Sequence, residues 1–165
     1  PGFVGEKHTP DNLFNPQYAI LYFHGGGYVM GSPASHRNLG ARIAAAAQLP
    51  VYMAAYRLAP EHSYPSQLDD AERAFLALVG QGYKPEHIFV GGDSAGGNLT
   101  LALALQLRES GVGMPAGWTG WARKQQVARK VACKPTPSKP CMPSPYFGCR
   151  YCSCGSRVPL TEAWD

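Results

Sequence analysis

The sequence predicts an α/β fold in which helices cover a parallel sheet. Three short apolar runs, rich in β-branched and aromatic residues, have the length of buried strands and span residues 18–23, 51–54 and 88–90. A segment with helical character follows each run, so strands and helices alternate along the chain. That alternation is typical of parallel strands joined by crossover helices. The expected core is therefore a three-layer αβα arrangement.

Each helix is expected from its own local signals. Four successive alanines favour a helix over residues 37–48, because alanine has the highest helix propensity. Apolar residues at helical spacing predict a second helix over residues 66–79, and Gly80 follows its end. An alanine- and leucine-rich run predicts the third helix, which ends at about residue 109.

The third predicted strand leads directly into Gly-Asp-Ser-Ala-Gly-Gly-Asn at residues 92–98. Gly92 and Gly96 leave room for a tight turn that projects the Ser94 hydroxyl above the sheet, as in a nucleophile elbow. Ser94 would then lie at a helix N-terminus, where backbone amides favour developing negative charge. A glycine-rich turn with an incidental serine is the alternative that this motif alone leaves open.

The first predicted strand ends in His-Gly-Gly-Gly at residues 24–27. Successive glycines expose backbone amides with no side chains in the way. Acyl transfer needs such donors, because the carbonyl oxygen becomes an oxyanion in the transition state. Loops of this type form the oxyanion hole beside the nucleophile elbow of lipases and esterases. Together, the two motifs predict a serine hydrolase.

A third segment, Tyr56–Pro65, lies between these motifs and reads Tyr-Arg-Leu-Ala-Pro-Glu-His-Ser-Tyr-Pro. With His24–Gly27 and Gly92–Asn98, it makes the chain resemble the hormone-sensitive-lipase-like α/β-hydrolases, the bacterial family IV esterases. The resemblance covers roughly residues 15–112. It implies the N-terminal half of an α/β-hydrolase fold. It also implies hydrolysis of small-molecule carboxylic esters, with short acyl chains, without metal or cofactor.

The resemblance also implies a role for each motif residue. Ser94 would attack the ester carbonyl and form an acyl-enzyme. The amides of Gly26, Gly27 and Ala95 would form the oxyanion hole, in a loop that Gly25 shapes. The other motif residues would support the site without reacting, namely His24, Gly92, Asp93, Gly96, Tyr56, Arg57 and Glu61. For Tyr56, Arg57 and Glu61, a solvated surface role is the equal alternative.

The sequence after Ser94 departs from the family's pattern. In α/β-hydrolases an acidic residue and then a histidine follow the nucleophile. Here no histidine follows Ser94, and the only later carboxylates are those of Glu109, Glu162 and Asp165. A serine without a general base is a weak nucleophile, so this chain alone is expected to be inactive. Two alternatives remain, a non-catalytic module that binds a small ligand and a fragment without any activity.

Residues 111–165 differ in composition from the rest of the chain. They hold eight Lys and Arg against two Asp and Glu, together with all five cysteines. The net charge of +4 therefore arises there and does not argue for a nucleic-acid partner. We expect a partial catalytic domain over residues 1–112. Residues 113–165 are expected to be an irregular, disordered tail. Our hypothesis is that the coding frame changes near Gly117 or that unrelated sequence is joined there.

The cysteines and the ends of the chain suggest further expectations. A zinc site at Cys149, Cys152 and Cys154 is disfavoured by irregular spacing and the lack of a nearby histidine. No signal peptide is evident, so a cytoplasmic location is expected, and no segment has the length of a membrane span. The length and the first residue, Pro1, indicate a fragment of undetermined oligomeric state. Three strands alone would leave the last one with an unpaired edge.

Overall fold

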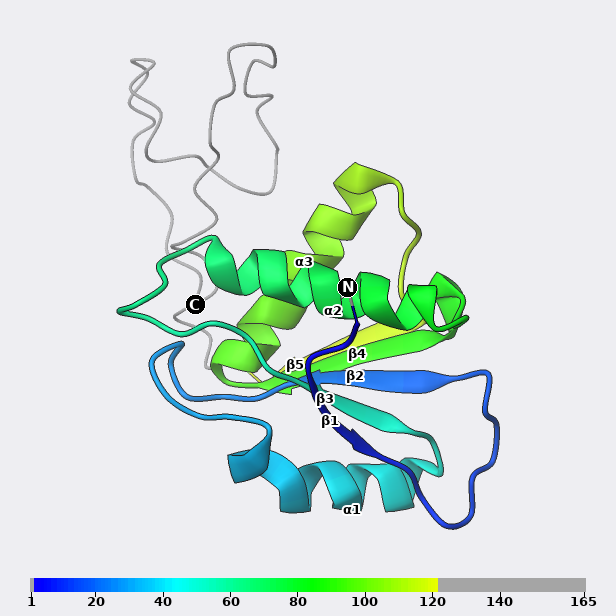
Figure 1. The fold of residues 1–165 in the computed structure, drawn as a ribbon. Coiled ribbons are helices and arrows are strands. Elements are labelled where there is room, and N and C mark those ends of the chain that lie inside the picture. The colour runs from blue at the N-terminus through cyan, green and yellow to red at the C-terminus, as the bar shows by residue number, and fades with distance from the viewer. Residues whose placement is uncertain (1, 122–165) are drawn as a thin grey trace, which may run out of the picture. The chain divides into compact units, whose positions relative to one another are not determined.

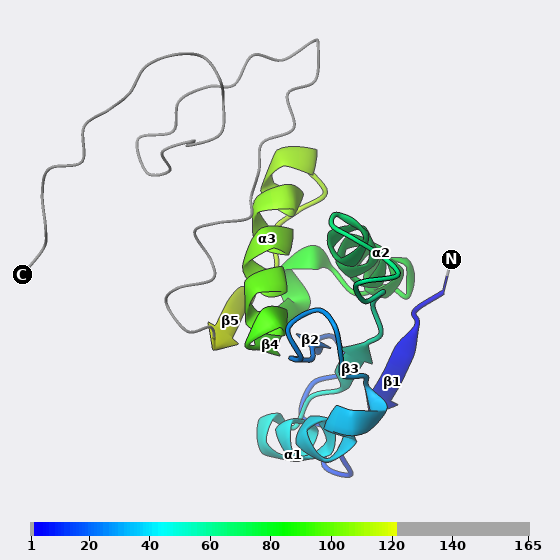
Figure 2. The same cartoon turned by 90° about the vertical axis from the view of Figure 1, so that its left-hand side faces the viewer.

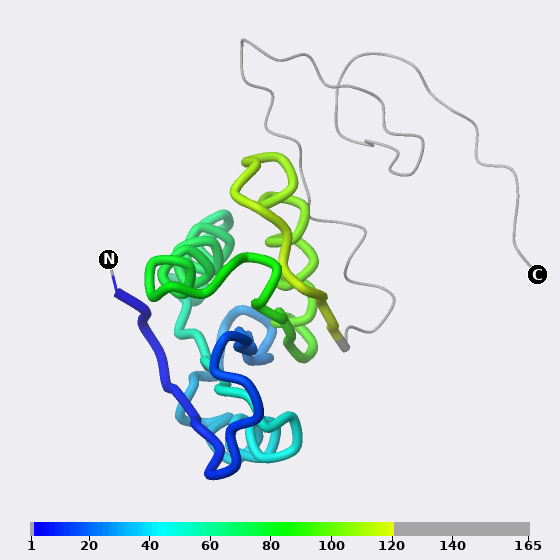
Figure 3. Tube along the Cα trace, turned by 90° about the vertical axis from the view of Figure 1, so that its right-hand side faces the viewer, coloured from blue at the N-terminus to red at the C-terminus, as the bar shows by residue number. Residues whose placement is uncertain are grey.

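The computed structural model describes residues 2–121 and contains one five-stranded sheet of order β1-β3-β2-β4-β5. Figure 1 shows the helices on the two faces of this sheet. The trace in Figure 3 follows the chain from β1 at one edge to β5 at the other. The strands are β1 (Gly5–His8), β2 (Ala19–Phe23), β3 (Val51–Ala54), β4 (Ile88–Asp93) and β5 (Gly117–Trp121).

Three α-helices of the described chain form the outer layers. They are α1 (Arg37–Ala47), α2 (Ser66–Gly80) and α3 (Ala95–Ser110), and short 3-10 turns precede α1 and β4 at Ala34–His36 and Pro85–His87. Helix α1 covers one face of the sheet, while α2 and α3 cover the other (Figures 1 and 2). The three-layer αβα core and the three helices expected from the sequence are therefore confirmed.

The central strands are parallel and in register. Phe23 at the end of β2 pairs with Ala54 at the end of β3 and with Gly92 near the end of β4. The carboxyl ends of all three strands therefore meet at one edge of the sheet. Ligands bind at this edge in open α/β sheets.

The expectation of a wholly parallel sheet is wrong at β1, which pairs with β3 in the antiparallel direction. This strand reads Gly-Glu-Lys-His, and none of its residues is fully buried. Because a half-exposed edge strand needs no continuous apolar run, β1 lacked the signal by which the buried strands were predicted.

A fifth strand pairs with β4, so the expected unpaired edge of β4 is also wrong. Strand β5 is parallel to β4, with Phe89 opposite Gly117. Regular structure therefore extends to Trp121, into the segment for which an irregular tail is expected. Residues 122–165, with the cysteines and most of the basic residues, lie outside the described residues, and the boundary at residue 112 stays a prediction.

One of the two glycines of β5 has a packing role. Glycine weakens a strand and commonly marks a close approach of another backbone. A Cβ atom at Gly120 would lie 2.8 Å from the Gly97 Cα of α3, closer than real Cβ atoms come. The contact between β5 and α3 therefore requires glycine at position 120, although glycine has a low propensity for strands.

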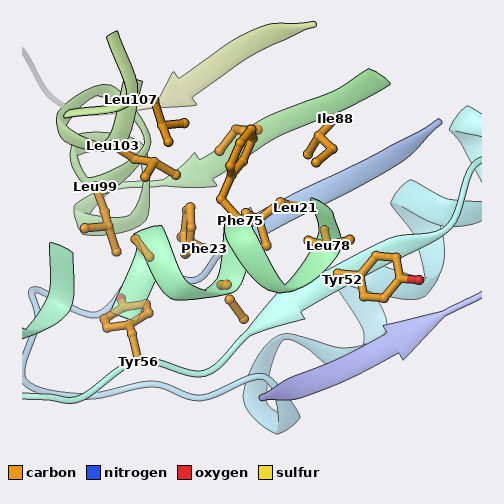
Figure 4. Packing of buried hydrophobic residues seen from close by; sticks show 14 of the residues in the cluster. Leu21, Phe23, Tyr52, Tyr56, Phe75, Leu78, Ile88, Leu99, Leu103 and Leu107 are labelled. Carbon is orange, nitrogen blue, oxygen red and sulfur yellow. The ribbon is translucent and has the colours of Figure 1, made fainter. Parts of the chain in front are cut away.

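The main hydrophobic core lies between the sheet and helices α2 and α3. Phe23 and Leu21 of β2 are fully buried there against Phe75 and Leu78 of α2, as Figure 4 shows. Alternate residues of β2, including Ile20, pack instead on the α1 side with Val51 and Met53 of β3 and Ala44. Both faces of the central strands are thus covered, which explains their continuous apolar sequences.

Arg57 anchors the loop after β3 to helix α2. Its Nε and Nη2 donate to the two carboxylate oxygens of Asp70 at 2.8 and 2.9 Å, and its backbone amide donates to Oδ2 at 2.9 Å. Arg73 adds a further bond to Asp70 Oδ1 at 2.8 Å. Burial raises the pKa of Asp70, but these bonds and charges outweigh burial and hold that pKa below its usual value.

Replacing Leu78 by alanine tests the α2 core contact. Leu78→Ala is expected to lower the free energy of unfolding by about 2–5 kcal/mol, because it leaves a cavity at a fully buried position. The matched control is Leu76→Ala on the same helix, where the side chain is 40% exposed; its cost is about 0.5 kcal/mol. Urea unfolding measures both, and equal losses would contradict the assigned core.

The Arg57–Asp70 anchor predicts a pH dependence of stability. A carboxylate with a lowered folded-state pKa stabilises the fold above its unfolded pKa, and the contribution disappears as pH falls through the folded pKa. The free energy of unfolding should therefore fall on acidification below the ordinary Asp pKa of 3.8. Urea unfolding at pH 5 and pH 3 should show a smaller fall for Asp70→Asn. Asp69→Asn, which removes the neighbouring carboxylate, should keep the wild-type fall.

Candidate active site

Ser94 occupies the turn between β4 and α3 in an unusual backbone conformation. Its φ is +49° and its ψ is −114°, a region that residues other than glycine rarely adopt. Ser94 is exposed, while Ala95 and Gly96 beside it are buried. Its side chain makes no capping hydrogen bond to α3. The hydroxyl is therefore presented at the carboxyl edge of the sheet, at the N-terminus of a 16-residue helix.

The backbone at this turn packs against the end of β2. A Cβ atom at Gly96 would overlap the carbonyl group of Phe23, and one at Gly92 would overlap the backbone of Gly96. Only glycine allows the three backbone segments to approach so closely. The close approach brings the start of α3 next to His24, the first residue of the glycine loop.

Asp93 fastens the glycine loop to the elbow. Its Oδ1 accepts a hydrogen bond from the Gly25 amide at 3.0 Å and another from the Tyr22 hydroxyl at 3.2 Å. A Cβ atom at Gly25 would overlap the Asp93 carboxylate. The Gly25 amide is therefore already engaged, and Gly25 shapes the loop rather than offering a donor. Sequence reasoning gave Tyr22 no role beyond its strand, and no motif marks it.

The next two glycines leave their amides available. Gly26 and Gly27 have φ values of +124° and +65°, a region that favours glycine. In the described part of the chain, their N–H groups donate to no protein acceptor. Ala95, in the first turn of α3, also has an amide without an intrahelical acceptor. Three backbone donors thus lie on the two segments that Asp93 joins.

A second bond joins the same two segments. The Tyr28 hydroxyl donates to Asn98 Oδ1 on α3 at 2.8 Å, and Tyr28 itself has a φ of +67°. Burial raises the pKa of Tyr28 to about 12, so the phenol stays a neutral donor. Sequence reasoning missed this pair, because residues 70 positions apart carry no local signal of contact.

His24 and Tyr56 form a buried stack beneath the loop. Their rings lie 4.3 Å apart, and the Tyr56 hydroxyl donates to the His24 carbonyl oxygen at 2.6 Å. His24 is 1% exposed, and burial lowers its pKa although the Gly25 carbonyl accepts from its Nδ1 at 2.8 Å. A neutral, buried histidine held in this way orients the loop.

The remaining predicted residues lie apart from Ser94 or take part only indirectly. Arg57 is committed to Asp70 on α2, and Glu61 is exposed and forms no salt bridge among the described residues. His36, which no sequence motif marks, lies with its Nε2 3.9 Å from Asp93 Oδ1.

The described residues offer neither a metal-binding cluster nor a membrane span. Across residues 2–121, no cluster of three or more His, Cys, Asp or Glu side chains could hold a metal ion. Cys149, Cys152 and Cys154, for which the sequence disfavours a zinc site, lie outside the described residues. None of the described helices is both long and apolar enough to span a bilayer.

Sequence relatives are esterases. An esterase of Acinetobacter venetianus is 43% identical over 98 residues, which are 59% of this chain and 32% of the relative. An ethyl acetate hydrolase of Pseudomonas putida is 46% identical over 115 residues, covering 62% of this chain and 36% of the relative. The chain thus spans about a third of the length of the curated relatives it matches.

Solved structures and a family comparison agree with these relatives. A homologue of hormone-sensitive lipase from a metagenome library, EstE7, superposes with a TM-score of 0.65 at 39% identity, covering 69% of this chain and 39% of that one. Residues 20–134 match the family described as the alpha/beta hydrolase fold. The chain therefore belongs to the α/β-hydrolase fold family, among the relatives of hormone-sensitive lipase.

Proposed function

We propose that Ser94 is the nucleophile of a carboxylic ester hydrolase. The observation that carries this proposal is the strained, exposed serine held beside two glycine amides without protein acceptors. Ester hydrolysis uses this combination, because the nucleophile and the oxyanion donors must converge on one carbonyl group. The esterase and ethyl acetate hydrolase among the relatives support the same chemistry and small acyl groups.

The proposed reaction proceeds through an acyl-enzyme. Ser94 Oγ attacks the ester carbonyl, and the carbonyl oxygen becomes an oxyanion that accepts hydrogen bonds from the amides of Gly26, Gly27 and Ala95. Collapse of this intermediate breaks the bond to the alkoxy oxygen, and the alcohol leaves with the proton that Ser94 gave up. Water then attacks the acyl carbon: its hydroxyl group leaves with the acyl group as the carboxylic acid, and its other proton restores the Ser94 hydroxyl. Asp93 contributes by holding the donors in position and forms no bond to the substrate.

This chain lacks an identified group for one step, the removal of the proton from the Ser94 hydroxyl. A general base must take the proton from the serine hydroxyl, and no histidine follows Ser94 in the sequence. We therefore propose that the chain alone is a very poor hydrolase that retains the nucleophile and the oxyanion donors. The same missing histidine favours a second candidate function, a non-catalytic module that binds small ligands with this fold.

Chemical rescue with imidazole separates these two functions. Incubated with a fluorophosphonate probe, the chain should be modified slowly at Ser94. Added imidazole should accelerate labelling by about tenfold, because it can accept the serine proton. Intact-mass measurement over time gives the rate, and peptide mapping gives the modified residue.

Two serine variants control this experiment. Ser94→Ala should abolish both the basal and the rescued labelling, whereas Ser110→Ala, at the far end of the same helix, should leave them unchanged. Binding of an ester analogue without any labelling at Ser94, with or without imidazole, would instead establish the binding module.

Loss of the Asp93 carboxylate should displace the oxyanion donors. Asp93→Ala removes the acceptor of the Gly25 amide and should cost about 1 kcal/mol of stability. It should also remove most imidazole-rescued labelling at Ser94, because the glycine loop loses its anchor. Tyr22→Phe is the matched control, since it removes only the phenol bond to the same oxygen. Equal labelling rates in the two variants would contradict this role of Asp93.

A further inference from the structure

A second hollow lies at the opposite end of the sheet from Ser94. Its volume is about 430 Å³, and side chains from β1, β3 and the turn before β4 line it. Tyr52 lies in the first half of β3, and residues 81–87 precede β4. The cavity therefore opens near the amino ends of these strands, away from the carboxyl edge where the elbow lies. Nothing in the ester hydrolase mechanism uses it.

The ionisable lining of this cavity holds basic side chains and no carboxylate. Lys7, Lys84 and His87 line it, and no carboxylate does. Neither lysine forms a salt bridge within the described part of the chain. The Lys7 ammonium lies instead 5.2 Å from the centre of the Tyr52 ring. Two ammonium groups gathered without a counter-charge create a positive potential that favours an anion.

Neutral hydroxyl and amide groups complete the lining. The Tyr52 hydroxyl lies 3.3 Å from both Gln81 Oε1 and the Tyr83 hydroxyl, in a short polar chain at the cavity. Burial, followed by the bond to Tyr52, raises the pKa of Tyr83 to about 12, so this phenol remains protonated. The Tyr83 phenol can donate a hydrogen bond to a bound oxyanion.

The lining is also held in place by aromatic contacts. The His87 ring stacks on Tyr18 at 4.3 Å, and Phe3 packs edge-on against Tyr52 at 5.2 Å. Tyr52 is only 3% exposed, so its hydroxyl group is fixed by the core. The donors are therefore partly preorganised, which lowers the entropy cost of binding.

We infer that this cavity binds the phosphate group of a small phosphate monoester. A dianionic phosphate matches two ammonium groups that line one hollow with the Tyr83 phenol and the His87 imidazole. The volume lies within the range of sites for small organic ligands, which leaves space for the group esterified to the phosphate. The site is independent of the proposed esterase function, since the two lie at opposite ends of the sheet.

Titration of the ¹⁵N-labelled 165-residue chain with phenyl phosphate tests this inference. At constant ionic strength, the amide signals of Tyr83, Lys84 and His87 should shift saturably. Phenol, which lacks the phosphate group, should leave them in place. Lys7→Gln and Lys84→Gln should each weaken binding about three- to fivefold, the usual range for a partly exposed charge. Both lysines are exposed, so neither substitution disturbs the core.

Arg108→Gln is the matched control, because it removes one exposed positive charge at the end of α3, outside the cavity lining. It should leave the affinity for phenyl phosphate unchanged. Equal weakening by all three substitutions would show attraction by net charge alone and overturn the site. Equal shifts with phenol, or shifts that sodium chloride reproduces, would also overturn it. Because no Ser94 chemistry is measured, failure here leaves the esterase proposal untouched.

Discussion

The close contact between the elbow and the end of β2 is the constraint on which the candidate site depends. Gly96 lies against the Phe23 carbonyl so tightly that any side chain at position 96 would overlap it. This contact fixes the start of α3 relative to β2, and Asp93 then reaches the Gly25 amide. The glycine loop that follows β2 is thereby held beside Ser94, which follows β4. The relative position of Ser94 and the glycine-loop amides therefore depends on backbone packing and on the Asp93 bond.

Near this contact, the backbone of Ser94 is strained, and buried side chains around it hold that conformation in place. Ser94 bears the unusual dihedral angles, and such strain persists only where surrounding structure over-determines it. The surrounding structure consists of neutral groups held by burial, including the His24–Tyr56 stack and the Tyr28–Asn98 bond. Burial shifts the pKa values of His24, Tyr28 and Tyr56 toward the neutral forms, so these side chains hold the loop as uncharged groups. The charged anchor joins Arg57, in the loop after β3, to Asp70 on helix α2.

Local patterns were sufficient for the buried elements and insufficient at the edges of the sheet. Strands β2, β3 and β4 were predictable because burial on both faces demands continuous apolar runs. Strand β1 is polar and half exposed, and β5 contains two glycines, one of which is required by contact with α3. The sequence of β1 reflects its exposure at the edge of the sheet, and the sequence of β5 reflects its contact with α3. Neither the edge position nor that contact can be inferred from local propensity or periodicity.

The sequence by itself determined the αβα architecture and the family, and it suggested Ser94 as the nucleophile that we propose, because apolar runs and three spaced motifs are local properties of the chain. Tertiary structure alone decided the antiparallel β1, the pairing of β5, and the partners of Asp93, Tyr28 and Arg57. It also gathered Lys7, Lys84 and His87 around one cavity. The hydrogen-bonded partners of Asp93 and Tyr28 lie 68 and 70 positions away in the sequence, and only the packing of the sheet brings them within hydrogen-bonding range.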